Sequence, residues 1–214
     1  MTNYTELRNW EYKIVGLGTQ EGSRIVRQLL ESMTEGIEVS SIRRIQHPLM
    51  FKRFVERGNE VMMKHNGNAN LQLLWHGTSE TPFKTILSSE SGLDALYGAR
   101  GFYGRGIYLA EHARYCNGDK NGKSGSDKET GRDYFTVNPD TGERELLLVL
   151  ATCGNPKQFG LHVNKKLDPT KDLIDTQRST EQIEVRFDSV RGGPHRPSLS
   201  GPGPNDSMIS VLYN

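Results

Sequence analysis

The sequence Leu74-Trp75-His76-Gly77-Thr78 ends one short apolar run, and Tyr103-Gly104-Arg105-Gly106-Ile107-Tyr108-Leu109-Ala110 contains the next. Both runs predict a short strand with a polar ring beside glycine. His76 follows strand-forming residues and precedes a glycine, which allows a ligand to approach the backbone closely. Tyr108 lies within the second run, and glycines come just before it. Two rings on separate strands, each next to bare backbone, predict a cleft for a flat ligand.

Together these two sequences resemble the catalytic domain of the poly(ADP-ribose) polymerase family, the diphtheria-toxin-like ADP-ribosyltransferases. Members of that family carry a His-Gly-Thr strand and a Gly-Lys-Gly-(Ile/Thr/Val)-Tyr-Phe-Ala strand that together hold NAD. Here Arg105 stands for the Lys and Leu109 for the Phe. The resemblance spans roughly residues 20–214 and includes three further matches, Arg43-Arg44-Ile45-Gln46-His47-Pro48-Leu49, Asp188-Ser189-Val190 and Val211-Leu212-Tyr213-Asn214.

Length and composition are typical of one globular domain. The chain has 214 residues, enough for a hydrophobic core of its own, and its formal net charge of +1 gives no attraction to nucleic acid or a membrane. Cys116 and Cys153 lack the spacing of a zinc site or a disulfide framework. No apolar run reaches the ~18 residues of a membrane-spanning helix, and the start of the chain is polar. We therefore expect an intracellular protein, cytoplasmic or nuclear.

A glycine-rich turn near the N-terminus offers a different interpretation. Gly16-Leu17-Gly18-Thr19-Gln20-Glu21-Gly22 stands between a short β-type run and a helix pattern, as in a dinucleotide-binding βαβ unit. The glycines are spaced one residue too far apart, and the preceding run is too short for a buried parallel strand. An NAD-dependent oxidoreductase is therefore kept only as an alternative. It predicts loss of the cofactor on Gly18→Asp and no effect of His76→Ala.

Apolar periodicity predicts two helices before the first motif. Ser23 is a candidate N-cap for the first helix, whose apolar residues share one face. Pro48 begins the second helix at its favoured first-turn position, and Asn66-Gly67-Asn68 ends it. Residues 37–45, between the two helices, predict a strand.

After the first motif the chain predicts mainly strands and loops, with a short helix over residues 82–87. Strands are expected over residues 134–137, 145–152, 183–187 and 208–213. The second of these is apolar enough to be central in a sheet. Residues 92–101, 117–133 and 192–205 predict loops. Residues 118–124 imitate a phosphate-binding loop, but only three residues separate the glycines, so that interpretation is rejected.

The expected fold class is α+β. The resemblance implies the ADP-ribosyltransferase fold, with two packed, mainly antiparallel β-sheets around an NAD cleft and flanking N-terminal helices. We expect one catalytic domain over residues 1–214, with a polar lead-in over residues 1–12 and an exposed loop insertion over residues 117–133.

The resemblance also assigns roles toward NAD, which is the substrate. The bond between nicotinamide and ribose is already weakened by the ring's positive charge, so the enzyme must position NAD and stabilise charge. His76 would hydrogen-bond a ribose hydroxyl, Gly77 would offer its backbone to the carboxamide, and Tyr108 would stack under the nicotinamide. Tyr115 and Cys116 lie nearest to a second stacking Tyr and a carboxamide-binding Ser, and a thiol is a poorer donor. The implied NAD-binding residues are His76, Gly77, Thr78, Arg100, Tyr108, Ala110, Tyr115 and Cys116.

The last strand bears on the kind of product. Polymerising family members place a Glu there, in the pattern Glu-Tyr-Ile-Val-Tyr, and laying the end of this chain on that pattern puts Ile209 at the Glu. An aliphatic side chain cannot accept a hydrogen bond or deprotonate an incoming ribose hydroxyl. The implied catalytic triad is His76, Tyr108 and Ile209, and the implied activity is transfer of a single ADP-ribose to an acceptor protein, this one included. Asp206 is an alternative base.

A competing class of function is an NAD- or ADP-ribose-binding module that has lost catalysis. The presence of His76 and Tyr108 argues against it, and Cys116 argues for it. The expected partners are NAD and an acceptor protein with acidic or nucleophilic side chains. No metal, membrane or nucleic acid is expected.

Overall fold

The computed structural model describes residues 10–33, 36–79, 81–89, 91–98, 100–116, 134–138, 140–195 and 207–213. The predicted loop insertion over residues 117–133 and the alternative base Asp206 lie outside these ranges.

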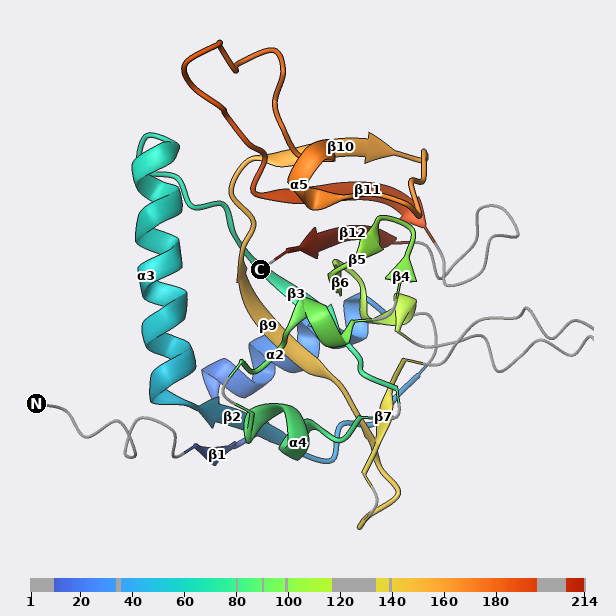
Figure 1. Ribbon diagram of the computed structural model, residues 1–214. Coiled ribbons are helices and arrows are strands. Elements are labelled where there is room, and N and C mark those ends of the chain that lie inside the picture. Colours follow the sequence, from blue (N-terminus) through green and yellow to red (C-terminus); the bar gives the residue numbers. More distant parts are fainter. Residues whose placement is uncertain are drawn as a thin grey trace, which may run out of the picture.

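A six-stranded sheet forms the centre of the molecule (Figure 1), with the strand order β10-β11-β12-β6-β3-β9. β10 and β11 run parallel, and the other neighbouring pairs are antiparallel. The strands are β3 (Leu71–His76), β6 (Ile107–Ala110), β9 (Leu147–Thr152), β10 (Pro156–Gly160), β11 (Ser189–His195) and β12 (Ser207–Leu212).

The sheet has two parts that meet at a narrow junction. Within the described residues, β3 and β6 are paired only at Trp75 and Ala110, whereas β3 and β9 are paired along their whole lengths. Ala110 is also the partner of Ile209 on β12. In Figure 1, β10, β11 and β12 lie side by side, and β9 runs at a steep angle to them. This division agrees with the expected α+β fold with two mainly antiparallel sheets.

Three two-stranded sheets surround the central one. They are β1 (Glu11–Val15) with β2 (Ile42–Gln46), β4 (Arg100–Gly101) with β5 (Gly104–Arg105), and β7 (Thr136–Val137) with β8 (Arg144–Glu145). β1 and β2 are antiparallel, although a dinucleotide-binding βαβ unit requires parallel strands. The Gly16–Gly22 turn therefore does not belong to such a unit.

Most of the helical residues precede the first motif. The helices are α2 (Gln20–Glu31), α3 (Pro48–Lys64), α4 (Phe83–Leu87) and α5 (Pro169–Asp172), with single 3-10 turns at η1 (Ala95–Tyr97) and η2 (Ala113–Tyr115). None of the helices in the described ranges is both long and apolar enough to cross a membrane.

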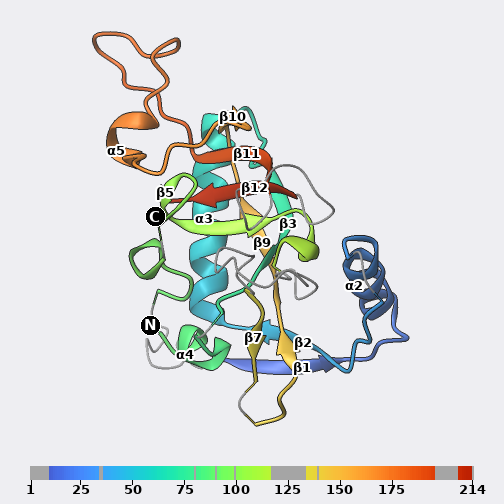
Figure 2. The same cartoon turned by 90° about the vertical axis from the view of Figure 1, so that its right-hand side faces the viewer.

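The predicted N-cap of the first helix was wrong by four residues. The hydroxyl of Thr19 accepts a hydrogen bond from the N–H of Gly22 at 3.1 Å, whereas Ser23 already lies inside the helix. The start of α3 at Pro48 is confirmed. α3 packs beside β9, where Gly58 faces Thr152, and Figure 2 shows it behind the sheet with α2 to one side.

Several strand predictions are also corrected. Residues 37–45 give a strand only from Ile42, and β9 lies at the edge of the sheet, where Leu150 is 46% exposed. Residues 183–187 form no strand apart from one isolated bridge at Arg186, because the Ser179 and Thr180 hydroxyls hold this segment in a turn. The loop predicted over residues 192–205 begins late, since β11 continues to His195.

The core divides along the same junction. One cluster joins β6, β11 and β12 through Tyr103, Val190, Ile209 and Val211. A second lies between β3, β6 and β9, around Leu74, Leu109 and Ala151. A third surrounds Trp75 and includes Met33, Ala113 and Cys116. Residues of the two motifs therefore belong to all three clusters.

Candidate active site

His76 and Tyr108 meet where β3 passes β6. His76 is the last residue of β3, and its Nδ1 atom lies 2.8 Å from the carbonyl oxygen of Tyr108. A side chain at the end of one strand is thus held by the main chain of the other. The structure therefore brings together the two residues that the sequence motifs singled out.

This contact defines the state of the His76 ring. A carbonyl oxygen only accepts hydrogen bonds, so we assign the proton to Nδ1, and Nε2 is left with a lone pair. Burial lowers the pKa of His76 from its usual value of 6.5, and the hydrogen bond to Tyr108 opposes that effect only in part. The imidazole is therefore neutral at pH 7, and Nε2 can accept a hydrogen bond from a hydroxyl group.

The Tyr108 ring is fixed at its hydroxyl end. The hydroxyl accepts a hydrogen bond from the N–H of Tyr103 at 2.8 Å and donates one to the carbonyl of Gly104 at 2.7 Å. Burial raises the pKa of Tyr108 to about 12, so the phenol stays protonated. A Cβ atom on Gly101 would lie 2.5 Å from the ring, so only glycine fits there. These contacts leave the ring few orientations.

Gly77 is explained by a residue that sequence reasoning did not select. A Cβ atom on Gly77 would lie 2.0 Å from the carbonyl oxygen of Tyr134, which accepts a hydrogen bond from the N–H of Ser79. The Tyr134 ring stacks on Tyr115 with 6.2 Å between centroids and an interplanar angle of 4°. Tyr134 and Tyr108 both pack against the apolar cluster that contains Tyr103 and Ile209. The main chain and Cβ of Tyr134 therefore lie beside Gly77, while its ring stacks on Tyr115.

The predicted pair Tyr115 and Cys116 lies deeper than expected. Tyr115 is 8% exposed and Cys116 3%, and the Cys116 thiol belongs to the apolar cluster around Trp75. Neither Cys116 nor Cys153 forms a disulfide. The main-chain carbonyl of Cys116 accepts a hydrogen bond from the N–H of Tyr134 at 2.9 Å. Tyr115 and Cys116 therefore contact Tyr134 through its ring and its main-chain N–H, and their role toward NAD stays a prediction.

Ile209 lies fully buried between neighbouring strands. It pairs with Ala110 on β6 and Gly192 on β11, and its exposed fraction is 0%. Ala110, also buried, is the residue at which three strands meet. Glu111, the next carboxylate along the chain, forms an ion pair with Arg191. The side chain of Ile209 therefore cannot form a hydrogen bond with a ribose hydroxyl.

The two remaining predicted residues lie at the border of this region. The hydroxyl of Thr78 is engaged by Thr136 at 2.7 Å and by the carbonyl of Thr81, so it ties the end of β3 to β7. Arg100 is exposed at the start of β4, in the hairpin that precedes Tyr108. The Thr78 hydroxyl thus holds β3 against β7, whereas the Arg100 side chain is exposed to solvent.

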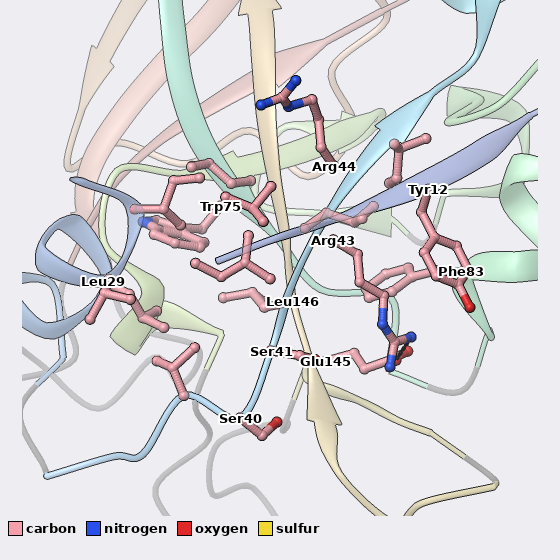
Figure 3. A pocket seen from close by; sticks show the side chains of 18 of the residues that line it. Tyr12, Leu29, Ser40, Ser41, Arg43, Arg44, Trp75, Phe83, Glu145 and Leu146 are labelled. Carbon is pink, nitrogen blue, oxygen red and sulfur yellow. Dashed lines mark hydrogen bonds and ion pairs between the residues drawn. The ribbon is translucent and has the colours of Figure 1, made fainter. Parts of the chain in front are cut away.

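A cavity of about 1240 Å³ lies on the other side of β3 (Figure 3). Leu73 and Trp75 line it, and they alternate along the strand with Leu74 and His76. Leu29 and Leu146 add further apolar lining. The charged residues Arg43 and Glu145 at this cavity form an ion pair with each other. Because the two motif strands meet at the hydrogen bond between His76 and Tyr108, we place the candidate active site there and not in this cavity.

Comparisons with known proteins identify the family of the chain. Residues 19–184 match the model of the poly(ADP-ribose) polymerase catalytic domain. The chain is also 29% identical over 178 residues to a probable poly [ADP-ribose] polymerase of Dictyostelium discoideum. That alignment covers 80% of this chain and 48% of the relative, so the chain spans about half the length of the curated relative it matches.

Proposed function

Because the chain belongs to the poly(ADP-ribose) polymerase catalytic domain family, whose members use NAD as a substrate, we propose that it transfers single ADP-ribose units from NAD to acceptor proteins. The observation that carries this proposal is the hydrogen bond from His76 Nδ1 to the Tyr108 carbonyl. It joins the two motifs that hold NAD in the family and leaves one acceptor nitrogen, Nε2, for a ribose hydroxyl.

The aromatic residues would take the nicotinamide half of NAD. Tyr108, fixed through its hydroxyl, offers one ring for stacking, and Tyr134 offers a second beside Gly77. The Gly77 backbone would bind the carboxamide. Flat stacking between aromatic rings and hydrogen bonds to backbone groups are the interactions that a planar amide requires.

These residues act by positioning. The bond between nicotinamide N1 and ribose C1′ breaks with its electron pair going to nicotinamide, and an acceptor atom forms the new bond to C1′. Nicotinamide leaves as a neutral ring, so no general acid is needed. His76 would hold a ribose hydroxyl, and the two rings would hold nicotinamide. Together they would keep the N1–C1′ bond in line with the acceptor atom.

Ile209 supports transfer of a single unit. Chain elongation requires the ribose hydroxyl of an attached unit to attack the next NAD, and that hydroxyl must lose its proton. A fully buried aliphatic side chain cannot accept this proton. A carboxylate of an acceptor protein needs no such help, because it is already deprotonated at pH 7. We therefore propose acidic side chains as the principal acceptors, in other proteins or in this one.

A binding module without catalysis is the second candidate. The observation that favours it is the position of Cys116, whose thiol packs in an apolar cluster although the family places a carboxamide-binding Ser near this point. Without that donor, NAD would bind and nicotinamide would remain attached.

One experiment separates the two candidates. NAD labelled on the adenine side is incubated with the protein and an acidic acceptor protein, and released nicotinamide and protein-bound label are measured together. The enzyme releases nicotinamide and labels protein, and both signals are lost in His76→Ala. NAD binding measured by calorimetry, with neither signal, would favour the binding module.

A further inference from the structure

The turn that fixes Tyr108 is held from a second side by the end of β12. The hydroxyl of Tyr213 donates a hydrogen bond to the carbonyl oxygen of Tyr103 at 2.7 Å. The N–H of the same residue, Tyr103, donates to the hydroxyl of Tyr108 at 2.8 Å. Both polar main-chain groups of Tyr103 are therefore bound by tyrosine hydroxyls, one from Tyr213 directly after β12 and one from Tyr108 on β6.

Glycines of the second motif leave room for these two rings. A Cβ atom on Gly106 would lie 3.1 Å from the Tyr213 ring and 2.5 Å from Val211, and a Cβ on Gly101 would lie 2.5 Å from the Tyr108 ring. Gly104 has φ of +73°, and a Cβ there would lie 2.5 Å from the carbonyl oxygen of Leu167. The three glycines thus let the turn pass between Tyr213, Tyr108 and the Leu167 backbone.

The side chain of Tyr103 gives the turn a fixed base. It is fully buried, and its ring contacts Phe159 with 5.1 Å between centroids. A Cβ on Gly192 would lie 1.8 Å from its hydroxyl oxygen, so β11 can pass this ring only as glycine. Since the Tyr103 ring cannot move, the direction of its two main-chain groups depends on the hydroxyls that bind them.

We propose that Tyr213 is a positioning residue for Tyr108: its hydroxyl holds the 103–104 peptide, which lies between the Tyr103 N–H and the Gly104 carbonyl that bind the Tyr108 hydroxyl and fix its ring for stacking. The inference rests on the proposed function for its effect on NAD, but the geometric link itself does not depend on it. Tyr213 touches neither of the two NAD-holding side chains through its own hydroxyl. It acts through the main chain of the 101–106 turn.

Hydrogen exchange of the protein without NAD tests the link. In Tyr213→Phe, the ring remains and the hydrogen bond is lost, so the peptide covering residues 101–108 exchanges faster by about 3- to 10-fold. Tyr97→Phe is the matched control. It removes the hydroxyl of a tyrosine that is 88% exposed, and exchange in residues 101–108 stays as in the original protein. Unchanged exchange in Tyr213→Phe would overturn the proposal.

A double-mutant cycle on NAD affinity tests the consequence. We expect Tyr213→Phe to weaken NAD binding by about 3- to 10-fold on its own and to have no further effect in a Tyr108→Phe background, where the ring has already lost its link to the turn. Equal effects of Tyr213→Phe in both backgrounds would contradict a role through Tyr108. If the original protein itself binds no NAD, the proposed function fails, and hydrogen exchange still decides the positioning role.

Discussion

The Nδ1 atom of His76 on β3 lies 2.8 Å from the main-chain oxygen of Tyr108 on β6. This contact fixes the imidazole and leaves Nε2 as its hydrogen-bond acceptor. We expect His76→Ala to weaken NAD binding by about 5- to 100-fold, because a buried polar group left unpaired costs ~1–3 kcal/mol. Calorimetric titration with NAD measures the effect. His162→Ala, at an exposed histidine that stacks on Phe159, is the control. If the original protein, His76→Ala and His162→Ala bind NAD with the same affinity, His76 does not bind NAD.

The pH dependence of NAD binding follows from the same ring. Burial lowers the pKa of His76 from 6.5, so Nε2 keeps its lone pair above that pH and gains a proton only below it. NAD affinity should therefore be flat above pH 6.5 and fall toward lower pH. His76→Gln should lose this dependence. Affinity that increases as the pH falls would show that the protonated ring is the binding form.

Stability should follow the same direction. The pKa of His76 is lower in the folded than in the unfolded protein, so the unfolded protein binds more protons as the pH falls below 6.5. This group therefore makes the free energy of unfolding decrease from pH 6.5 downward and adds no pH dependence above it. Urea unfolding of the original protein and His76→Gln across this range measures the difference. If the free energy of unfolding changes equally with pH in the two proteins, the pKa of His76 is not lowered by folding.

Gly77→Ala tests the close approach of β3 to Tyr134. The new methyl group would meet the Tyr134 carbonyl at 2.0 Å, so the backbone at Tyr134 must move. We expect a loss of ~1–3 kcal/mol in the free energy of unfolding and weaker NAD binding. Gly18→Ala is the control, because a Cβ there meets nothing within 4 Å.

Tyr134 should contribute through its ring and not its hydroxyl. Tyr134→Phe keeps the stack with Tyr115 and should bind NAD as the original protein does. Tyr134→Leu should bind about 2- to 10-fold more weakly, in line with the ~0.5–1.5 kcal/mol of an aromatic pair. Fluorescence or calorimetric titration of both variants is the measurement. Equal affinities for the Phe and Leu variants would show that the second ring does not contact nicotinamide.

The sequence was sufficient to locate the two motif strands and the start of α3. His76 and Tyr108 stand at strand positions beside glycines, and Pro48 occupies the first turn of a helix, so local rules applied to each. The cap of α2 was misplaced because both Thr19 and Ser23 satisfy the residue preference for an N-cap. Only the hydrogen bond from Gly22 to Thr19 decides between them.

Long-range contacts account for the remaining differences. Seventeen residues separate Cys116 from Tyr134, so nothing local indicates that the Tyr134 carbonyl fills the space beside Gly77. The apolar run of β9 suggested a central strand, yet within the described residues β9 pairs with β3 alone, and its residues Leu148 and Leu150 line the cavity. Apolar and polar residues alternate over residues 183–187, but the hydroxyls of Ser179 and Thr180 bind the N–H groups of this segment and hold it in a turn. In the first two cases a tertiary contact overrode a local pattern, and in the third a hydrogen bond to a hydroxyl three to six residues away did so.

Analysis of the protein-bound product tests the central claim most directly. After reaction with NAD, the modified protein is digested with a pyrophosphatase, which cuts between the two phosphates of each ADP-ribose. Single units release AMP alone, whereas a chain joined through ribose hydroxyls also releases AMP that carries an additional ribose phosphate. We predict AMP alone from the original protein and no nucleotide from His76→Ala. Ribosylated AMP would contradict the account, because it would mean that chains elongate although Ile209 cannot take a proton.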